Sequence, residues 1–227
     1  MIEKILVFTA TYNEADNVKD LVHEISINLP AADILICDDD SPDGTSEKVI
    51  ELQKNLPNLQ LIRRPRKIGL GTAHKLAMKY AVTNNYDQLI TMDADFSHSP
   101  SSLGSICSKL STNDFVIGSR YIEGGECNYG LVRLTLSRVA NVITRLLLGI
   151  RLKETTTSFR GFRKSLLQDL EVDKIKAEGY SFFFESLYQV SQVTDKLCEI
   201  PIIFEDRRFG TSKISKSEIL PAIVASI

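Results

Sequence analysis

The chain has 227 residues, of which 43% are hydrophobic and 25% are charged, and its formal net charge is −2. This composition is that of a soluble globular domain with a sizeable core, and the near-neutral charge argues against a nucleic-acid-binding protein. The four cysteines are scattered without a Cys-x-x-Cys pair, so we expect reduced thiols and a cytoplasmic protein rather than a zinc site or a disulfide framework. No stretch reaches the roughly 20 apolar residues that a membrane-spanning helix needs.

The first half of the chain alternates between two hydrophobic patterns. Short apolar runs predict strands at Ile5–Thr9, Asp33–Cys37, Leu59–Ile62, Gln88–Met92 and Phe115–Gly118. Between them, apolar residues at helical spacing predict helices, for example at 18–29 and 73–80. Such alternation predicts a single α/β domain, in which a Rossmann-like, mainly parallel sheet is flanked by helices on both faces.

The pattern changes from about Gly124 onward. A glycine-rich turn leads into a long basic amphipathic helix, expected at 131–152, and a further helix is expected at 181–193. A strand is predicted at 197–204, and the chain given ends in an apolar run at 219–227. No internal repeat or low-complexity linker separates the halves, so we expect the second half to complete the same domain.

Two carboxylates spaced by one residue, Asp93 and Asp95, follow the predicted strand at 88–92. Because ligands of open α/β sheets bind at the carboxyl ends of the strands, this pair could hold a divalent cation against a diphosphate. The alternative is that both aspartates cap the following helix. His98 could orient the cation or cap the helix that begins near Pro100, and its spacing does not decide between these roles.

Two more predicted strands end in polar residues. The strand at 33–37 runs into three consecutive acids, Asp38–Asp40, which repel one another unless a ligand or cation uses them. The first strand is followed by Tyr12 and Glu14, which can offer an aromatic face and a carboxylate to a nucleobase. Helix capping would explain any one of the three strand ends, but together they predict a nucleotide site.

A glycine-rich segment at 69–73 follows a basic cluster at 63–67. It resembles a phosphate-binding loop at the start of a helix. It is not a Rossmann fingerprint, because His74 stands where the third glycine would be, and it is not a P-loop, because no Gly-Lys-Ser/Thr occurs. The alternative for the basic cluster is an ordinary solvated face.

A second basic set lies in the latter half of the chain. Its members, with one serine among them, are Arg120, Arg133, Ser137, Arg138, Arg207 and Lys213. Arg133 and Ser137 are one helical turn apart. Cations placed opposite an acidic nucleotide site indicate a second anionic substrate, whereas the alternative is surface charge, which is our interpretation of Arg145 and Arg151.

The chain resembles the inverting glycosyltransferases of family two, and within them the dolichol- or polyprenol-phosphate mannose synthases, over nearly its whole length. The motifs that carry the resemblance are Thr11-Tyr12-Asn13-Glu14, Asp38-Asp39-x-Ser41-Pro42-Asp43-Gly44-Thr45, Gly69-Leu70-Gly71-Thr72-Ala73, Asp93-Ala94-Asp95-Phe96-Ser97-His98-x-Pro100, Gly118-Ser119-Arg120-Tyr121, Ser137-Arg138-x-Ala140-Asn141, Ser158-Phe159-Arg160 and Asp206-Arg207-x-x-Gly210-x-Ser212-Lys213.

This resemblance implies a glycosyltransferase-A fold and the inverting, metal-dependent transfer of mannose from GDP-mannose to a dolichyl or undecaprenyl phosphate. It implies a nucleotide-sugar-binding half at 1–123 and an acceptor-binding half at 124–216, with 217–227 as an apolar segment able to associate with a membrane. Peripheral attachment to the cytosolic membrane face would follow, alone or through a membrane-anchoring subunit, with no nucleic-acid partner. The alternative is a polyprenyl-phosphate glucosyltransferase or another enzyme that uses a UDP-sugar.

The same resemblance assigns roles to individual residues. The donor would be bound by Ala10, Tyr12, Glu14, Cys37, Asp39, Asp93, Ala94, Asp95, Arg120, Arg207 and Lys213. Among these, Asp93 and Asp95 would hold Mg²⁺ or Mn²⁺ and, with Arg120, Arg207 and Lys213, form the catalytic set. The acceptor phosphate would be received by Arg133, Ser137 and Arg138. The chain departs from the family pattern at Ala10, Asp40 and Glu154, where proline, glycine and aspartate are usual.

Overall fold

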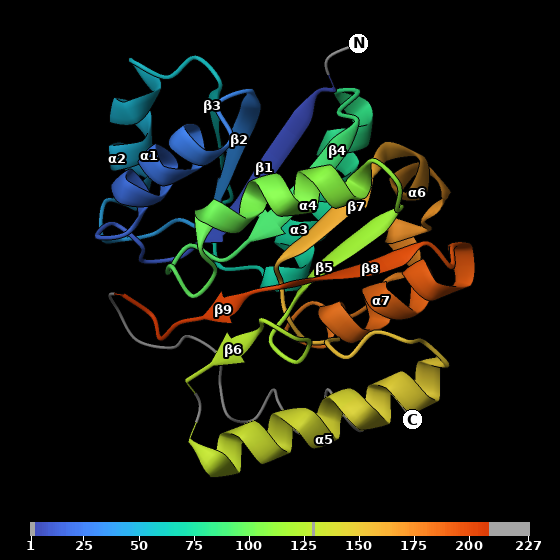
Figure 1. Ribbon diagram of the computed structural model, residues 1–227. Coiled ribbons are helices and arrows are strands. Elements are labelled where there is room, and N and C mark those ends of the chain that lie inside the picture. Colours follow the sequence, from blue (N-terminus) through green and yellow to red (C-terminus); the bar gives the residue numbers. More distant parts are fainter. Residues whose placement is uncertain (1–2, 129, 209–227) are drawn as a thin grey trace.

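The computed structural model describes residues 3–128 and 130–208, and its centre is a seven-stranded sheet with the strand order β3-β2-β1-β4-β7-β5-β8 (Figure 1). All neighbouring pairs are parallel except those of β7, which runs antiparallel to both β4 and β5. The strands are β1 (Ile5–Thr11), β2 (Ala32–Asp38), β3 (Leu59–Arg63), β4 (Gln88–Met92), β5 (Phe115–Ser119), β7 (Arg160–Arg163) and β8 (Leu197–Pro201). The mainly parallel sheet is therefore confirmed.

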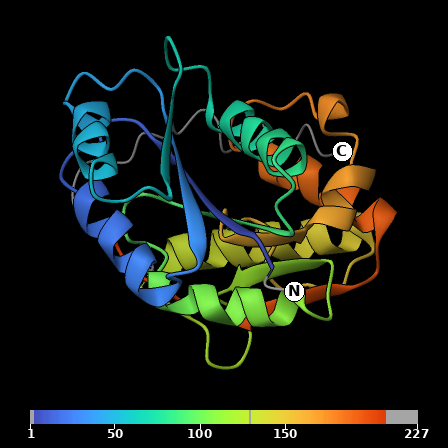
Figure 2. The same cartoon turned by 90° about the horizontal axis from the view of Figure 1, so that it is seen from above.

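Helices cover both faces of this sheet. On one face of the sheet lie α3, α6 and α7, and on the other lie α1, α2 and α4, of which α4 packs against β4, β5 and β7 (Figures 1 and 2). The helices are α1 (Val18–Asn28), α2 (Thr45–Gln53), α3 (Leu70–Thr83), α4 (Leu103–Leu110), α5 (Leu131–Leu148), α6 (Lys164–Asp169) and α7 (Phe182–Val193), with short 3₁₀ turns η1 (Pro100–Ser102) and η2 (Val172–Lys174). Residues from 160 to 201 contribute two strands to this sheet, so the two halves of the chain share one core.

The five predicted strands of the first half are all present, but two expectations for the second half are wrong. The segment at 197–204 forms two strands, because β8 joins the main sheet while β9 (Ile203–Phe204) pairs with β6 (Glu126–Cys127). The helix expected at 131–152 ends at Leu148, since Gly149 adopts the left-handed conformation (φ 65°) and its N–H bonds to the carbonyl of Arg145. A left-handed glycine is a common helix terminator.

The glycine-rich segment at 69–73 serves packing more directly than phosphate binding. The N–H of Gly71 donates to the carbonyl of Glu178 at 2.6 Å, so this donor is already used. A Cβ at Gly71 would lie 2.7 Å from the Cβ of Phe182 and 2.9 Å from the carbonyl oxygen of Glu178. The absence of a side chain therefore lets α3 approach the start of α7.

We expect Gly71→Ala to lower the free energy of unfolding by about 1–3 kcal/mol, the usual cost of overpacking, because two of the clashing atoms belong to the backbone. Gly104→Ala is the matched control: Gly104 is an exposed position of α4 with no atom within 4 Å of the new Cβ. There alanine should stabilise the helix by up to about 1 kcal/mol. Urea denaturation measures both, and equal stability of the two variants would contradict the packing role.

Candidate active site

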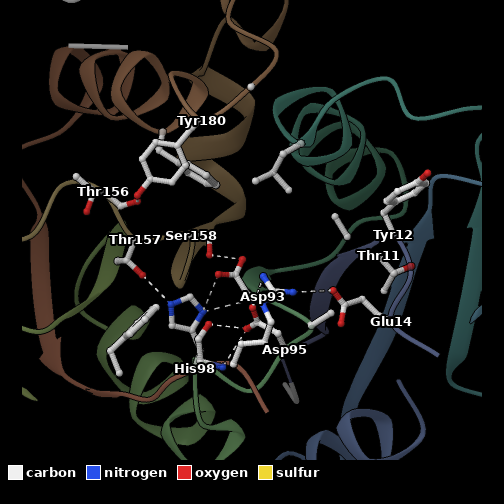
Figure 3. A pocket seen from close by; sticks show the side chains of 18 of the residues that line it. Thr11, Tyr12, Glu14, Asp93, Asp95, His98, Thr156, Thr157, Ser158 and Tyr180 are labelled. Atoms are coloured by element: carbon white, nitrogen blue, oxygen red, sulfur yellow. Dashed lines mark hydrogen bonds and ion pairs between the residues drawn. The ribbon is translucent and has the colours of Figure 1, made fainter. Parts of the chain in front are cut away.

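The carboxyl ends of β1, β2 and β4 meet at a cavity of about 540 Å³ (Figure 3). Parallel neighbours end at the same edge of a sheet, so side chains that follow different strands converge there. Nine of the residues that the sequence predicts for donor binding line the cavity, namely Ala10, Tyr12, Glu14, Asp39, Asp93, Ala94, Asp95, Arg120 and Arg207. The cavity therefore brings together acids from three strand ends and two arginines from distant segments.

The two carboxylates after β4 are held in different ways. Asp93 is partly exposed, with 36% of its side chain accessible, and its Oδ1 accepts from the hydroxyl of Ser158 at 2.6 Å. Asp95 is buried, and its Oδ1 accepts from the N–H and the hydroxyl of Ser97 at 3.0 and 2.7 Å. Burial raises the pKa of Asp93, and the charge of Asp95 adds to this against the opposing effect of His98. A bound cation would oppose both effects, because it stabilises the charged form of the carboxylate.

Arg207 lies between two acids of this cavity. Its Nη2 is 2.8 Å from Oδ2 of Asp95, and its Nη1 is 3.3 Å from Oε1 of Glu14. The guanidinium thereby joins the ends of β1 and β4 through charge-assisted contacts. A nucleoside diphosphate entering the cavity would offer this arginine phosphate oxygens in exchange for carboxylate oxygens.

The donor set fits a hard divalent cation. Asp93 and Asp95 supply carboxylate oxygens, which Mg²⁺ and Mn²⁺ prefer. Within residues 3–128 and 130–208, no group of three or more acids, histidines or cysteines is placed to hold a metal ion by itself. A cation here would be held by one or two carboxylates and would complete its coordination with diphosphate oxygens and water.

His98 fixes the backbone at the acidic pair. The ring is buried, stacks on Phe159 with centroids 5.1 Å apart, and accepts at Nδ1 from the N–H of Asp93 at 3.3 Å. Burial lowers its pKa, against the raising effect of Asp93. The imidazole is therefore neutral near pH 7, with Nε2 carrying the proton toward Thr157 at 3.0 Å. The sequence left open whether His98 orients a cation or caps the helix near Pro100. The structure shows a third role, because the ring connects the backbone of Asp93 to the hydroxyl of Thr157 through hydrogen bonds.

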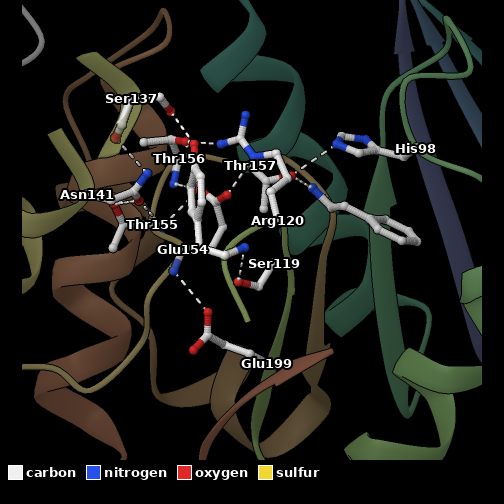
Figure 4. Close-up of polar contacts among 12 residues, drawn as sticks. His98, Ser119, Arg120, Ser137, Asn141, Glu154, Thr155, Thr156, Thr157 and Glu199 are labelled. Carbon is white, nitrogen blue, oxygen red and sulfur yellow. Dashed lines mark hydrogen bonds and ion pairs between the residues drawn. The ribbon is translucent and has the colours of Figure 1, made fainter. Parts of the chain in front are cut away.

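A buried ion pair holds the other arginine (Figure 4). Nε of Arg120 donates to Oε2 of Glu154 at 2.7 Å, and Nη2 donates to the hydroxyl of Thr156 at 2.7 Å. Glu154 is fully buried and also accepts from Thr155 and Thr156. The guanidinium is thus oriented at the wall of the cavity by partners from the segment at 154–156.

Comparison with known proteins agrees with this geometry. Residues 6–171 match the glycosyl transferase family 2. The chain belongs to this family. It is 31% identical over 222 residues to undecaprenyl-phosphate mannosyltransferase of Micrococcus luteus, covering 97% of this chain and 91% of that protein. It is 34% identical over 224 residues to polyprenol monophosphomannose synthase of Mycolicibacterium smegmatis, covering 97% and 84%.

A solved structure shows the same fold. Glucosyl-3-phosphoglycerate synthase of Mycobacterium tuberculosis, in complex with Mn²⁺, UDP and glucosyl-3-phosphoglycerate, superposes with a TM-score of 0.69 at 16% identity, covering 99% of this chain and 78% of that one. The present protein is therefore a glycosyltransferase with the glycosyltransferase-A fold. No helix in the part of the chain that the structure describes combines the length and apolar character needed to cross a bilayer.

The structure separates some of the predicted residues from the cavity of this glycosyltransferase. Cys37 is fully buried in the core beneath α3 and does not line the cavity; burial raises the pKa of its thiol to about 11. The reason is strand alternation, which turns the side chain of Cys37 toward one helical layer. Ser137 lies on α5, where its hydroxyl accepts from Tyr121 at 2.7 Å, and Arg138 is exposed on the same helix.

Arg133 belongs to α5, and its position one helical turn before Ser137 agrees with the predicted helix. Lys213, predicted for the catalytic set, lies outside the described residues, as does the apolar segment 217–227.

Sequence reasoning missed several residues of the site. Arg64 belongs to the basic cluster for which a solvated face was the alternative, yet it is only 7% exposed, and its Nη2 donates to Oδ2 of Asp39 at 2.7 Å. Thr156, Thr157 and Ser158 line the cavity opposite Glu14 (Figure 3). The serine belonged to a motif that carried the family resemblance, but no local signal placed the threonines beside Asp93.

Proposed function

We propose that this glycosyltransferase moves mannose from GDP-mannose to a polyprenyl phosphate, with inversion and with the help of Mg²⁺ or Mn²⁺. The observation that carries the proposal is the meeting of Asp93 and Asp95 with Arg120 and Arg207 in one cavity. This arrangement suits two anionic substrates held close together. The names of the Micrococcus and Mycolicibacterium relatives support mannose as the sugar and a polyprenyl phosphate as the acceptor.

For the donor, we assign the base to the side of the cavity formed by Tyr12, Glu14 and Asp39, with Ala10 beside them. Arg64 holds both oxygens of Asp39 and so presents the carboxylate in one orientation. A fixed carboxylate can accept hydrogen bonds from the N–H groups of guanine without losing side-chain freedom on binding. The division into a donor half at 1–123 and an acceptor half at 124–216 is part of this proposal.

The chemistry needs little proton transfer from the protein. A phosphomonoester acceptor carries about −1.5 to −2 charge at pH 7, so its oxygen can attack the anomeric carbon of mannose directly, and a single displacement inverts the configuration. Asp93 and Asp95 would hold the cation, which when bound neutralises the departing diphosphate. Arg207 would exchange Asp95 and Glu14 for donor phosphate oxygens, and Arg120 would face the acceptor phosphate.

For the acceptor, we propose that Arg133, Ser137 and Arg138 of α5 receive the lipid phosphate, with Lys213 joining the donor phosphates. The face of α5 that points away from the sheet carries exposed apolar side chains, including Leu136, Leu146 and Leu147 at 66%, 73% and 53% exposure. An amphipathic helix of this kind can lie in the plane of a membrane surface. We therefore propose peripheral attachment at the cytosolic membrane face, alone or aided by an anchoring subunit.

The experiment that tests the function is a matrix of donors and acceptors. The full chain is incubated with radiolabelled GDP-mannose, UDP-glucose and other UDP-sugars, and with a short polyprenyl phosphate, in Mg²⁺, Mn²⁺ or excess chelator. We expect transfer from GDP-mannose, lost in chelator, and a β-linked product. Preference for a UDP-sugar would establish the alternative donor, which is the class of nucleotide held by the glucosyl-3-phosphoglycerate synthase of the same fold.

If the protein attaches to membranes through α5, the double variant Leu146→Ser/Leu147→Ser should float less with vesicles of any lipid composition. Both substitutions remove apolar area from the exposed face of the helix. Ile27→Ser, at 59% exposure on α1, is the matched control and should leave flotation unchanged. Circular dichroism verifies the fold. Equal flotation of all variants would assign attachment to another part of the chain or to a partner.

A further inference from the structure

A second cavity, of about 270 Å³, lies beneath one edge of α5. It is lined by Tyr121, Arg138, Asn141, Val142, Arg145 and Lys153. None of these residues lines the larger cavity that holds the acidic pair. The smaller cavity is therefore a separate space, on the side of the molecule that carries the exposed apolar face of α5.

Three cations converge on this small space without local neutralisation. Arg138, Arg145 and Lys153 form no ion pair within the described part of the chain. The nearby acids are engaged elsewhere. Glu199 accepts from the backbone N–H groups of Lys153 and Glu154 at 2.9 Å, and Glu154 is paired with Arg120. Three like charges around one hollow repel one another, so an anion entering it would be favoured by all three.

The helical register places these cations at the border of the apolar face. Arg138 and Arg145 are two turns apart, so they lie in one row along α5. Asn141, on the buried side, anchors this row to the body, since its Oδ1 accepts from the N–H and the hydroxyl of Thr155 at 2.6 and 2.7 Å. If the face bearing Leu146 rests on a bilayer, the cavity lies at the depth of the lipid headgroups.

We propose that this cavity binds the phosphate of an anionic membrane phospholipid, and that this contact orients α5 on the bilayer. The inference rests on the proposed function only in taking the enzyme to work at a membrane surface. The bound lipid is not the acceptor, because its phosphate would be held by Arg145 and Lys153, which the proposed function does not use, whereas the acceptor phosphate has to reach the donor sugar in the larger cavity, which shares no lining residue with this one. Arg138, assigned above to the acceptor, lines this cavity as well but is left out of the lipid contact. Phosphate recognition by the cationic side chains of Arg145 and Lys153 is the chemistry that the cavity offers.

The test compares Arg145→Gln with Arg151→Gln in the full chain. Arg151 is an exposed arginine just beyond the end of α5 and does not line the cavity. On vesicles of phosphatidylcholine mixed with phosphatidylglycerol, the affinity of Arg145→Gln should fall roughly fivefold or more, the effect of one basic residue at an anionic surface, while Arg151→Gln changes little. Lys153→Gln should repeat the effect of Arg145→Gln. Equal losses at positions 145 and 151 would indicate diffuse surface charge and overturn the site.

A soluble probe distinguishes the source of the phosphate. Calorimetry with dihexanoylphosphatidylglycerol below its micellar concentration should detect binding that Arg145→Gln removes, with weaker binding of inorganic phosphate and none of dihexanoylphosphatidylcholine. Binding of inorganic phosphate as tight as that of the lipid would overturn the assignment to a phospholipid.

Transfer of mannose to a short, detergent-dispersed polyprenyl phosphate should be unchanged in Arg145→Gln. A parallel loss of this transfer would assign the cavity to the acceptor instead and overturn the proposal. The two proposals can fail separately. If neither the unmodified chain nor any variant transferred mannose, but Arg145→Gln still weakened binding to vesicles that contain phosphatidylglycerol, the proposed function would fail and the lipid site would stand.

Discussion

Asp93→Asn is expected to lower the rate of sugar transfer at least about a hundredfold, because the substitution halves the carboxylate charge available to a divalent cation and weakens electrostatic stabilisation of the leaving diphosphate. The fold should hardly change. Asp93 is partly exposed at the cavity wall, and asparagine retains an oxygen that can accept from Ser158. Initial rates measured over a titration of Mn²⁺ should show that saturation requires a higher metal concentration than in the unmodified chain.

Asp16→Asn provides the matched control for this prediction. Asp16 is an exposed aspartate near the end of β1 that does not line the cavity, so its loss should leave both rate and metal dependence unchanged. Thermal unfolding of both variants separates loss of activity from loss of fold. If Asp93→Asn kept the full rate, or the unmodified chain kept its rate in excess chelator, the acidic pair would have no metal role.

Glu154→Gln is expected to lower the free energy of unfolding by about 3–5 kcal/mol, because it removes one charge of a buried ion pair, in which Nε of Arg120 is 2.7 Å from Oε2 of Glu154. Glu171→Gln is the matched control. Glu171 and Lys174 form an ion pair in which both side chains are more than half exposed, and such surface pairs contribute at most about 1 kcal/mol. Denaturant titration of both variants measures the difference, and similar small losses would mean that Arg120 finds another partner.

The same pair makes a contribution that depends on pH. Burial raises the pKa of Glu154, but the charge of Arg120 and the hydrogen bonds from Arg120 and Thr156 outweigh this effect, and the pKa is lowered overall. A carboxyl with a lowered pKa contributes stability above its usual value of 4.5, and this contribution is lost as the pH falls through the folded-state pKa. The stability difference between the unmodified chain and Glu154→Gln should therefore narrow on acidification below about pH 4.5. A difference independent of pH would exclude ionisation of this glutamate as its cause.

Much of the fold was predictable from local patterns. The runs that form β1, β2, β4 and β5 are short, rich in apolar residues and almost entirely buried, so their strand character follows from burial on both faces of the sheet. Their carboxyl ends must share one edge, and this made the convergence of Glu14, Asp39 and the acidic pair predictable. The sequence by itself therefore determined the five strands of the first half, the ligand-binding edge of the sheet and the acids that line it.

What the tertiary structure decided was the opposite wall of the cavity. The segment Arg160–Arg163 has an arginine at each end and a glycine within, which is no strand signal, yet it forms β7 between β4 and β5. Backbone hydrogen bonds to β4 and β5 hold β7 in this position. Gly161 leaves room for Ile106 of α4, because a Cβ added at Gly161 would lie 2.4 Å from the side chain of Ile106. This insertion carries Thr157 and Ser158 to the acidic pair. Local sequence periodicity does not predict the position of β7. Its strand conformation depends on pairing with residues some 70 positions away, which become neighbours only in the folded chain.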